Sequence, residues 1–254
     1  MKNILKLIFL FSVIFIKSQS DENSELEIKY DFVFVNDTLD KSHPLSEQMT
    51  LLTNGKKSNY FSENYKARAA AFGKQLRGAT NNEVVTINMS GVPEARVKHS
   101  VYKDENGIFI SNSLGRTLYT FKSADLKTWK IFNQDTKNIL GYKCTKATIE
   151  IDNKKYIAWF TYDIPINDGP YKFKGLPGLI LEVSEIHEYF KFSAVSITKV
   201  KLPIEFRKGV LINKEQYINK RNEYIADPSQ GKINNPEYRR RIDENKKKYN
   251  NSLE

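Results

Sequence analysis

Residues 159–183 read WFTYDIPINDGPYKFKGLPGLILEV, and this stretch is unlike the rest of the chain. It begins and ends as apolar strand sequence, with two turn-rich clusters between, Asp168-Gly169-Pro170 and Gly175-Leu176-Pro177-Gly178. Proline cannot donate to a sheet ladder, and glycine permits positive φ or a close backbone approach. We therefore predict an ordered loop between a strand at 155–162 and a strand at 179–186.

The loop is predicted to be a structural clamp first. Tyr171, Phe173 and Leu176 are apolar enough to pin it to the core, and such anchoring lets dense backbone irregularity be tolerated. Gly175 or Gly178 is expected at positive φ, where a Cβ atom is unfavourable.

Strand sequences dominate outward from the loop, and Asn54-Gly55 is typical hairpin-turn chemistry. Their spacing predicts a mainly β fold built on a single large antiparallel sheet system, as a curved sheet, a sandwich or a half-open barrel. The expected strands lie at 26–35, 49–53, 58–62, 83–89, 95–104, 108–111, 116–121, 126–132, 141–151, 155–162, 179–186 and 189–200.

Helical sequence is confined to three segments. The alanine-rich residues 63–77 predict one inserted helix, which we expect to lie across the sheet or a cavity mouth. Residues 214–225 and 235–249 predict a C-terminal helical tail, with Pro236 at a first helical position. The domain organisation expected is a signal peptide at 1–20, a β-rich domain at 21–212 and a basic helical tail at 213–254.

The heptapeptide Lys174-Gly175-Leu176-Pro177-Gly178-Leu179-Ile180 contains GLPGLI, and the chain resembles the GLPGLI family of Bacteroidetes proteins. The family pattern continues upstream. Four segments match the family pattern in order: Trp129-Lys130-Ile131, Ile139-Leu140-Gly141-Tyr142-Lys143-Cys144-Thr145-Lys146-Ala147, Trp159-Phe160-Thr161 and Asp163-Ile164-Pro165. The resemblance covers residues 129–200 and implies export and a fold more than an activity.

The first twenty residues have the pattern of a secretory signal peptide. Lys2 and Lys6 precede an apolar run at 7–16, and Ser18 and Ser20 suit a signal peptidase site. The run is shorter than the ~20 apolar residues of a membrane-spanning helix, and no later segment approaches that length. We expect export to the periplasm or cell surface, as a soluble protein cleaved near Ser20.

The chain is basic, with 40 Lys and Arg against 30 Asp and Glu, a net charge of +10. Without Lys2, Lys6 and Lys17 of the leader, 37 basic residues face 30 acidic ones, a net charge of +7. Much of the excess lies between 220 and 248, which predicts a solvated helical face, or a surface for acidic glycans or lipid head groups. An exported protein rarely meets nucleic acid, so no nucleic-acid partner is expected.

The sequence lacks the motifs of common catalytic and metal sites. Cys144 and three scattered histidines cannot supply a spaced ligand set, so no metal or cofactor is expected, and Cys144 is predicted to be buried. Three carboxylates flank the loop, Asp163, Asp168 and Glu182, and they are candidates for an envelope hydrolase. Turn formation is the preferred explanation of Asp163 and Asp168.

The function expected is an exported, non-catalytic binding or assembly module of the cell envelope, with the hydrolase as the alternative. Its partner would be an outer-membrane or envelope component, or an apolar or glycan ligand. No catalytic residue is assigned. The candidate binding residues lie in and beside the loop: Trp159, Asp163, Pro165, Gly169, Pro170, Phe173, Gly175, Leu176, Pro177 and Gly178. Trp129, like Trp159, is a candidate for a ligand surface or for the core.

Overall fold

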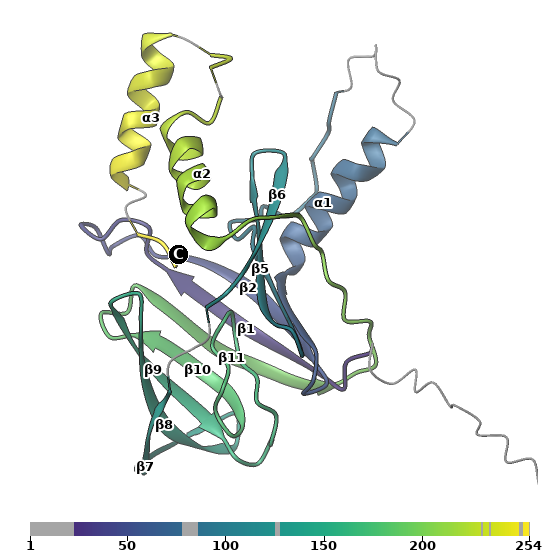
Figure 1. Cartoon of the computed structure of the whole chain (residues 1–254), viewed down its shortest axis with the longest axis vertical. Coiled ribbons are helices and arrows are strands. Elements are labelled where there is room, and N and C mark those ends of the chain that lie inside the picture. The colour runs from purple at the N-terminus through teal and green to yellow at the C-terminus, as the bar shows by residue number, and fades with distance from the viewer. Residues whose placement is uncertain are drawn as a thin grey trace, which may run out of the picture.

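A computed structural model describes residues 23–77, 86–124, 128–229, 231–233, 235–248 and 251–253. The expected signal peptide lies outside these residues. The described strands form one open, strongly curved sheet, as Figure 1 shows. No helix among the described residues is long and apolar enough to cross a bilayer.

The sheet has twelve strands in the order β12-β6-β5-β4-β3-β2-β1-β11-β10-β9-β8-β7. All neighbours pair antiparallel except β12 and β6, which are parallel, so the predicted mainly β, antiparallel system is confirmed with one exception. The strands are β1 Leu26–Phe34, β2 Leu45–Thr53, β3 Ser58–Ser62, β4 Ser100–Asp104, β5 Gly107–Leu114, β6 Thr117–Lys122, β7 Lys130–Ile139, β8 Tyr142–Ile151, β9 Lys154–Thr161, β10 Leu179–Glu185, β11 Phe190–Lys199 and β12 Val210–Leu211. The helices are α1 Glu63–Leu76, α2 Lys214–Ala226 and α3 Pro236–Lys248.

The main core lies on the concave face of the sheet, with β1 at its centre between β2 and β11. Alternate residues of β1 point into it, because successive side chains of a strand face opposite sides. Phe32 is buried and stacks on Phe192 of β11, with ring centroids 4.3 Å apart and planes 3° from parallel. The two halves of the sheet therefore meet at an aromatic seam.

A smaller core covers the opposite face of β2–β5. It contains Leu52, Phe61 and Tyr102, each the sequence neighbour of a residue in the main core. The segment 200–209 crosses this face, and Phe206 stacks on Tyr102 with centroids 4.3 Å apart. This crossing delivers β12 alongside β6 in the parallel direction.

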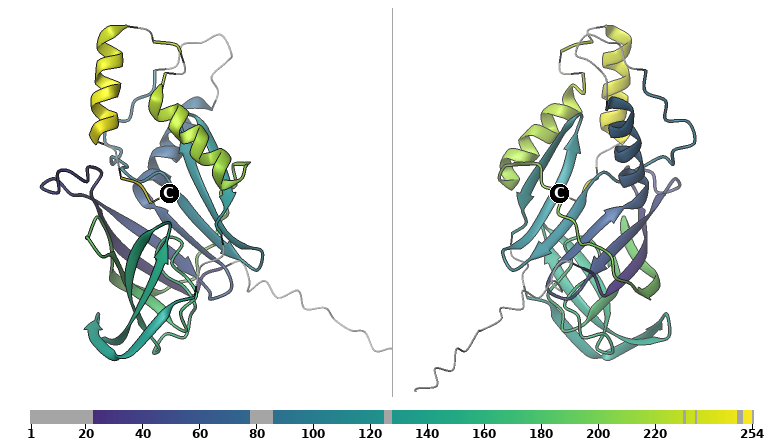
Figure 2. Two further views of the ribbon diagram at one scale, coloured as in Figure 1. Left: turned by 60° about the vertical axis from the view of Figure 1, so that its left-hand side comes forward. Right: turned by 90° about the vertical axis from the view of Figure 1, so that its right-hand side faces the viewer.

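Helix α1 follows β3 directly, with the Ser62 side chain accepting a hydrogen bond from the Tyr65 amide at its N-terminus. None of its residues is buried, and it projects from the sheet in Figures 1 and 2 instead of lying across it. Its first turns border a cavity of about 190 Å³, through Tyr65, Lys66 and Ala69. The helix therefore does not lie across the sheet, and it borders a cavity with its first turns.

Four predicted strands differ from the observed ones by four residues or more, and one of them is β2, which begins at Leu45 and not at residue 49. Residues 86–89 form no strand, and 83–85 lie outside the described residues; the Gln75 side chain pairs instead with the Asn88 main chain in both directions. The strand expected at 95–104 begins only at Ser100, and the strand expected at 126–132 is β7, which extends to Ile139.

Helix α2 begins with a capping box between Asn213 and Gln216. It packs on the sheet through Tyr217, which is 1% exposed and stacks on Phe121 of β6 at 4.7 Å. The Tyr217 hydroxyl accepts a hydrogen bond from the Asn112 side chain at 2.7 Å. The second helix of the tail, α3, contacts α2. The boundary near residue 213 stays a prediction.

We expect Tyr217→Ala to destabilise the protein by about 3 kcal/mol, because it removes a fully buried aromatic ring. Tyr217→Phe should cost about 1 kcal/mol, the net value of one hydrogen bond. Urea denaturation followed by circular dichroism measures both. Tyr224→Ala on the same helix is the control, since Tyr224 is only partly buried. If Tyr217→Ala unfolds like the wild type, α2 is not part of the cooperative unit.

Candidate functional site

The loop between β9 and β10 fills the concave side of the sheet. Tyr171, Phe173 and Leu176 are each at most 1% exposed, as the clamp prediction requires. Trp129 lies in the core, and its indole nitrogen donates to the Lys174 carbonyl at 2.7 Å. The Tyr30 hydroxyl donates to the Ile180 carbonyl at 2.6 Å, which fixes the start of β10.

Asp168 is the centre of a buried ionic cluster at the beginning of this loop. It is 0% exposed and lies 3.0 Å from the Lys103 ammonium of β4. Lys174, itself 4% exposed, donates to the other carboxylate oxygen, and the Thr53 hydroxyl of β2 donates at 2.9 Å. The Asp168 carbonyl also accepts the Ile180 amide at 2.9 Å. The carboxylate of Asp168 thus connects β2, β4 and the loop, and its main-chain carbonyl adds β10.

The charges of this cluster set its protonation states. Burial opposes the ionised form of Asp168, but Lys174 and Lys103 outweigh it and lower the pKa of the carboxyl to about 2. Burial also lowers the pKa of Lys174 to about 8, although Asp168 opposes that shift. At neutral pH the carboxylate is therefore ionised and neutralised inside the core.

The glycines of the loop are required for two different reasons. Gly175 has φ +98°, which confirms the expectation of a left-handed backbone at one of the two signature glycines. Gly178 has no positive φ, but a Cβ there would lie 2.0 Å from the Thr161 carbonyl oxygen. At Gly169 a Cβ would lie 2.7 Å from the Phe173 carbonyl oxygen. The loop and the neighbouring strand pack too closely for any side chain at these two positions.

The candidate binding residues of the loop separate into two groups. The first group is buried and packs in the interior of the protein: Gly169, Pro170, Phe173, Leu176 and Gly178. The exposed members are Asp163, Pro165, Gly175 and Pro177. Trp159 lies half-buried on β9, with the Lys137 ammonium 4.5 Å from the centre of its ring.

The three candidate carboxylates have separate environments. Asp168 is enclosed in its ionic cluster and has no exposed surface. Glu182 on β10 is paired with Lys137 at 2.7 Å. Asp163 is exposed in the turn after β9, where its amide bonds to the Thr161 hydroxyl. No substrate can reach Asp168, so a catalytic pair that includes it is not formed.

Metal and thiol chemistry have little support in the described part of the chain. No group of three or more histidine, cysteine, aspartate or glutamate side chains in it is placed to hold a metal ion. Cys144 is 0% exposed, as expected, and burial raises the pKa of its thiol to about 11. Burial therefore favours the protonated thiol at neutral pH, the less reactive form.

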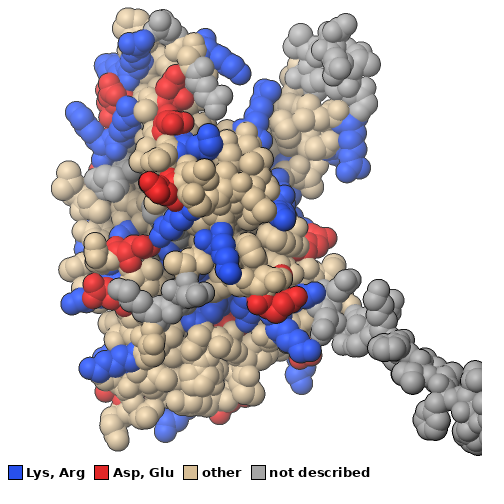
Figure 3. Space-filling view, viewed as in Figure 1, with Lys and Arg blue, Asp and Glu red and all other residues tan. Residues whose placement is uncertain are grey.

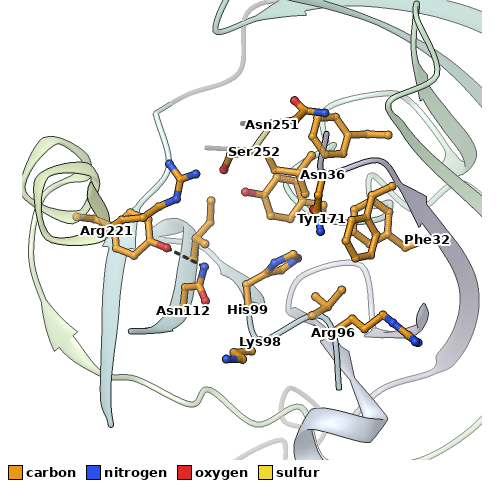
Figure 4. A pocket seen from close by; sticks show the side chains of 16 residues that line it. Phe32, Asn36, Arg96, Lys98, His99, Asn112, Tyr171, Arg221, Asn251 and Ser252 are labelled. Carbon is orange, nitrogen blue, oxygen red and sulfur yellow. Dashed lines mark hydrogen bonds between the residues drawn. The ribbon is translucent and has the colours of Figure 1, made fainter. Parts of the chain in front are cut away.

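A cavity of about 250 Å³ lies at the end of the concave face near α2, and Figure 4 shows its walls. Seven separate segments meet there: β1 with the residue Asn36 after it, the stretch before β4, β5, the signature loop, β11, α2 and the segment 251–253. The lining residues are Phe32, Phe34, Asn36, Arg96, Val97, Lys98, His99, Ile110, Asn112, Tyr171, Phe190, Tyr217, Arg221, Asn251, Ser252 and Leu253. Aromatic walls with a few polar groups are typical of small-molecule sites.

Tyr171 is the wall of the cavity that belongs to the signature loop. Its φ is +49°, a left-handed backbone that is uncommon for a bulky residue and costs about 1–3 kcal/mol. Its ring lies 4.9 Å from the ring of His99. The clamp that holds the loop in the core thus also holds a strained aromatic residue at the cavity.

The segment before β4 is positioned by Glu47 of β2. This carboxylate is 5% exposed and accepts hydrogen bonds from the amides of Arg96 and Val97, the latter at 2.9 Å, and from the Ser62 hydroxyl. A carboxylate that binds main-chain amides fixes the path of the chain. Glu47 therefore places His99 against Tyr171 without entering the cavity.

The charged residues of the cavity are all basic. In Figure 4 the His99 ring points into the space below Tyr171, whereas Lys98 and Arg96 extend outward to either side. No aspartate or glutamate is among the lining residues. Across the wider face in Figure 3, lysine and arginine are scattered and interspersed with acids, with no single basic patch.

Sequence reasoning missed this cavity, apart from naming Tyr171 as an anchor of the loop. No motif marks it, because its residues come from seven segments with ordinary local patterns. His99 is one of three scattered histidines in the sequence, and its local pattern does not distinguish it from the other two.

Comparison with known proteins adds a family model and a fold. A model described as a protein of unknown function (Porph_ging) matches residues 150–182, from the end of β8 through the signature loop into β10. No curated protein matches the chain. Two crystal structures of PNGF-II, in space groups P21 and C2, have TM-scores of 0.54 and 0.51 and sequence identities of 17% and 16%.

Each PNGF-II comparison covers 77% of this chain, but this chain spans only about a third, 32%, of PNGF-II. At such identities the likeness concerns the fold alone. An uncharacterized conserved protein from Thermus thermophilus has a TM-score of 0.36 at 6% identity, over 75% of this chain and 91% of that chain.

Replacing the loop glycines by alanine should destabilise the protein. We expect a loss of about 3 kcal/mol for Gly178→Ala from its backbone clash, and about 1–2 kcal/mol for Gly175→Ala from its positive φ. Thermal melting measures both. Gly73→Ala is the matched control: with nothing within 4 Å of its Cβ in α1, it should stabilise by about 0.5–1 kcal/mol. Wild-type melting of both loop variants would contradict the clamp.

The Asp168 cluster predicts a pH dependence. A carboxyl whose pKa is lowered from 3.8 to about 2 contributes stability above pH 3.8 that is lost as the pH falls toward 2, about 2 kcal/mol in all. Asp168→Asn should cost about 3–5 kcal/mol at pH 7, because Lys174 and Lys103 lose their counter-ion.

The difference in unfolding free energy between wild type and Asp168→Asn should therefore shrink from pH 4 to pH 2, as measured by urea denaturation at each pH. Asp163→Asn is the control and should change stability by less than about 0.5 kcal/mol. A difference for Asp168→Asn that stays constant with pH would show that the cluster does not titrate as described.

Proposed function

We propose that this protein is an exported, non-catalytic binding module of the bacterial cell envelope and a member of the GLPGLI family. The residues Lys174–Ile180 and the family-model match over residues 150–182 support the membership. The leader-like pattern of residues 1–20 supports export. Its ligand is an apolar or glycan molecule, bound in the cavity of about 250 Å³ at the end of the concave face.

The observation that carries this proposal is the construction of the cavity. Phenylalanine and tyrosine rings line it, those of Phe32, Phe34, Tyr171, Phe190 and Tyr217, and such rings offer stacking faces to an apolar ligand or a sugar. Amide side chains of Asn36 and Asn112 and the guanidinium of Arg221 supply directional polar contacts. The strain at Tyr171 is typical of a functional site.

A hydrolase is the weaker interpretation of the same fold. Asp168 is buried in ion pairs within its cluster, and Glu182 is paired with Lys137. Neither of these carboxylates lines the cavity. A binding role uses the groups that the cavity offers, whereas hydrolysis has no observation in its favour.

Native mass spectrometry of the protein from its own host tests the proposal. We expect a non-covalent ligand on the wild type and its loss in Asn36→Trp, because the indole ring would fill the cavity mouth. Asn138→Trp, on the exposed face of β7, is the matched control and should keep the ligand. A wild type without ligand, or equal retention by Asn36→Trp, would contradict this site.

A further inference from the structure

The segment 251–253 returns from the helical tail to the sheet and forms one side of the cavity. Its main-chain trace ends between the helices and the concave face in Figures 1 and 2. In Figure 4, Asn251 and Ser252 lie on the side of the cavity opposite Lys98 and Arg96. The contacts of these three residues have the pattern of a bound peptide.

Asn251 binds the chain just beyond β1 through two hydrogen bonds. Its main-chain amide donates to the Asn36 carbonyl at 3.1 Å, and its side-chain amide donates to the Val35 carbonyl at 2.9 Å. One residue thus satisfies two successive main-chain acceptors. Main-chain acceptors of this kind accept any peptide that presents the same donors.

Lys154, at the start of β9, binds the segment from the other side. Its ammonium donates to the Asn251 side-chain oxygen at 3.3 Å and to the Ser252 carbonyl, and it lies 4.8 Å from the centre of the Phe190 ring. Burial lowers the pKa of Lys154, so the carbonyl partners compensate for water that the ammonium has lost.

Leu253 completes the contact by packing against the main core at the cavity wall. The segment therefore supplies an asparagine, a main-chain carbonyl and an apolar anchor within three residues. None of these contacts depends on the covalent connection to α3.

We propose that the rim formed by Val35, Asn36, Lys154 and Phe190 is a binding site for an extended peptide of the form Asn-x-apolar, and that residues 251–253 occupy it in this structure. The segment is then an intramolecular ligand, which a peptide from another chain can replace. This site goes beyond the proposed function, since it concerns a polypeptide ligand at the rim and not the molecule in the cavity.

The test uses the full-length chain and a fluorescein-labelled peptide of sequence YNNSLE, residues 249–254. In the double variant Asn251→Ala/Leu253→Asp the chain's own segment loses its side-chain contacts and keeps only two main-chain hydrogen bonds, so the intact peptide should displace it and fluorescence anisotropy should show peptide binding. The wild type should bind at least tenfold more weakly, because a tethered segment competes at an effective concentration in the millimolar range.

Two matched controls identify the site. On the double-variant background, Lys154→Met should weaken peptide binding at least tenfold, whereas Lys155→Met, the exposed neighbour, should leave it unchanged. A peptide carrying the Asn251→Ala change should also bind at least tenfold more weakly than YNNSLE.

Absence of peptide binding by a folded double variant, or equal binding after Lys154→Met, overturns the proposal. Near-ultraviolet circular dichroism reports whether the variant is folded. If it is not, titration of the wild type with millimolar peptide decides: saturable competition that Lys154→Met abolishes supports the site, and none overturns it. Failure here leaves the ligand in the cavity, and hence the proposed function, to its own mass-spectrometric test.

Discussion

The buried ion pairs of Asp168 are the constraint on which the architecture depends. Lys103 comes from β4 and Thr53 from β2, in one half of the sheet, whereas Asp168 and Lys174 belong to the loop joined to the other half. Two charges removed from water cost several kcal/mol each unless their partners are well placed. An arrangement that misplaces any of these strands leaves a charge uncompensated, so the cluster selects one docking of the loop against the sheet.

This selection extends to the cavity. Tyr171 lies between Asp168 and Lys174 in the sequence, and the strained backbone that turns its ring toward His99 is held by the two anchored ends. Glu47 fixes the segment that carries His99 in the same way, by accepting hydrogen bonds from main-chain amides. Two buried carboxylates, neither of which touches the cavity space, therefore determine its two facing walls.

The strands were predictable because alternation and turn chemistry are local. Asn54-Gly55 and Asp152-Asn153 both mark tight hairpins, and the latter two residues have φ of +51° and +61°. The two-residue β12 was not predictable, since it is too short for a periodic pattern and depends on a segment that crosses the back of the sheet.

From the sequence, Asp168 was interpreted as a turn former or a catalytic acid. Neither interpretation included Lys103, the residue with which it pairs. Lys103 is distant in the sequence and sits in a strand of ordinary composition, so no local signal joins the two residues. The glycines differ in this respect, because Gly175 and Gly178 indicate a backbone restriction from the sequence alone. What the sequence hides here is the pairing of charges and walls across segments, which only the folded sheet brings together.

The position of β1 at the centre of the sheet has a consequence for how the protein is made. β1 pairs with β2, which follows it closely, and with β11, whose residues 190–199 are synthesised much later. Until β11 arrives, β1 has an open hydrogen-bonding edge and an uncovered apolar face, and pairings so distant in sequence form slowly. During synthesis, the strand Leu26–Phe34 is therefore exposed to pairing with other chains, although neither of its edges is free in the folded protein.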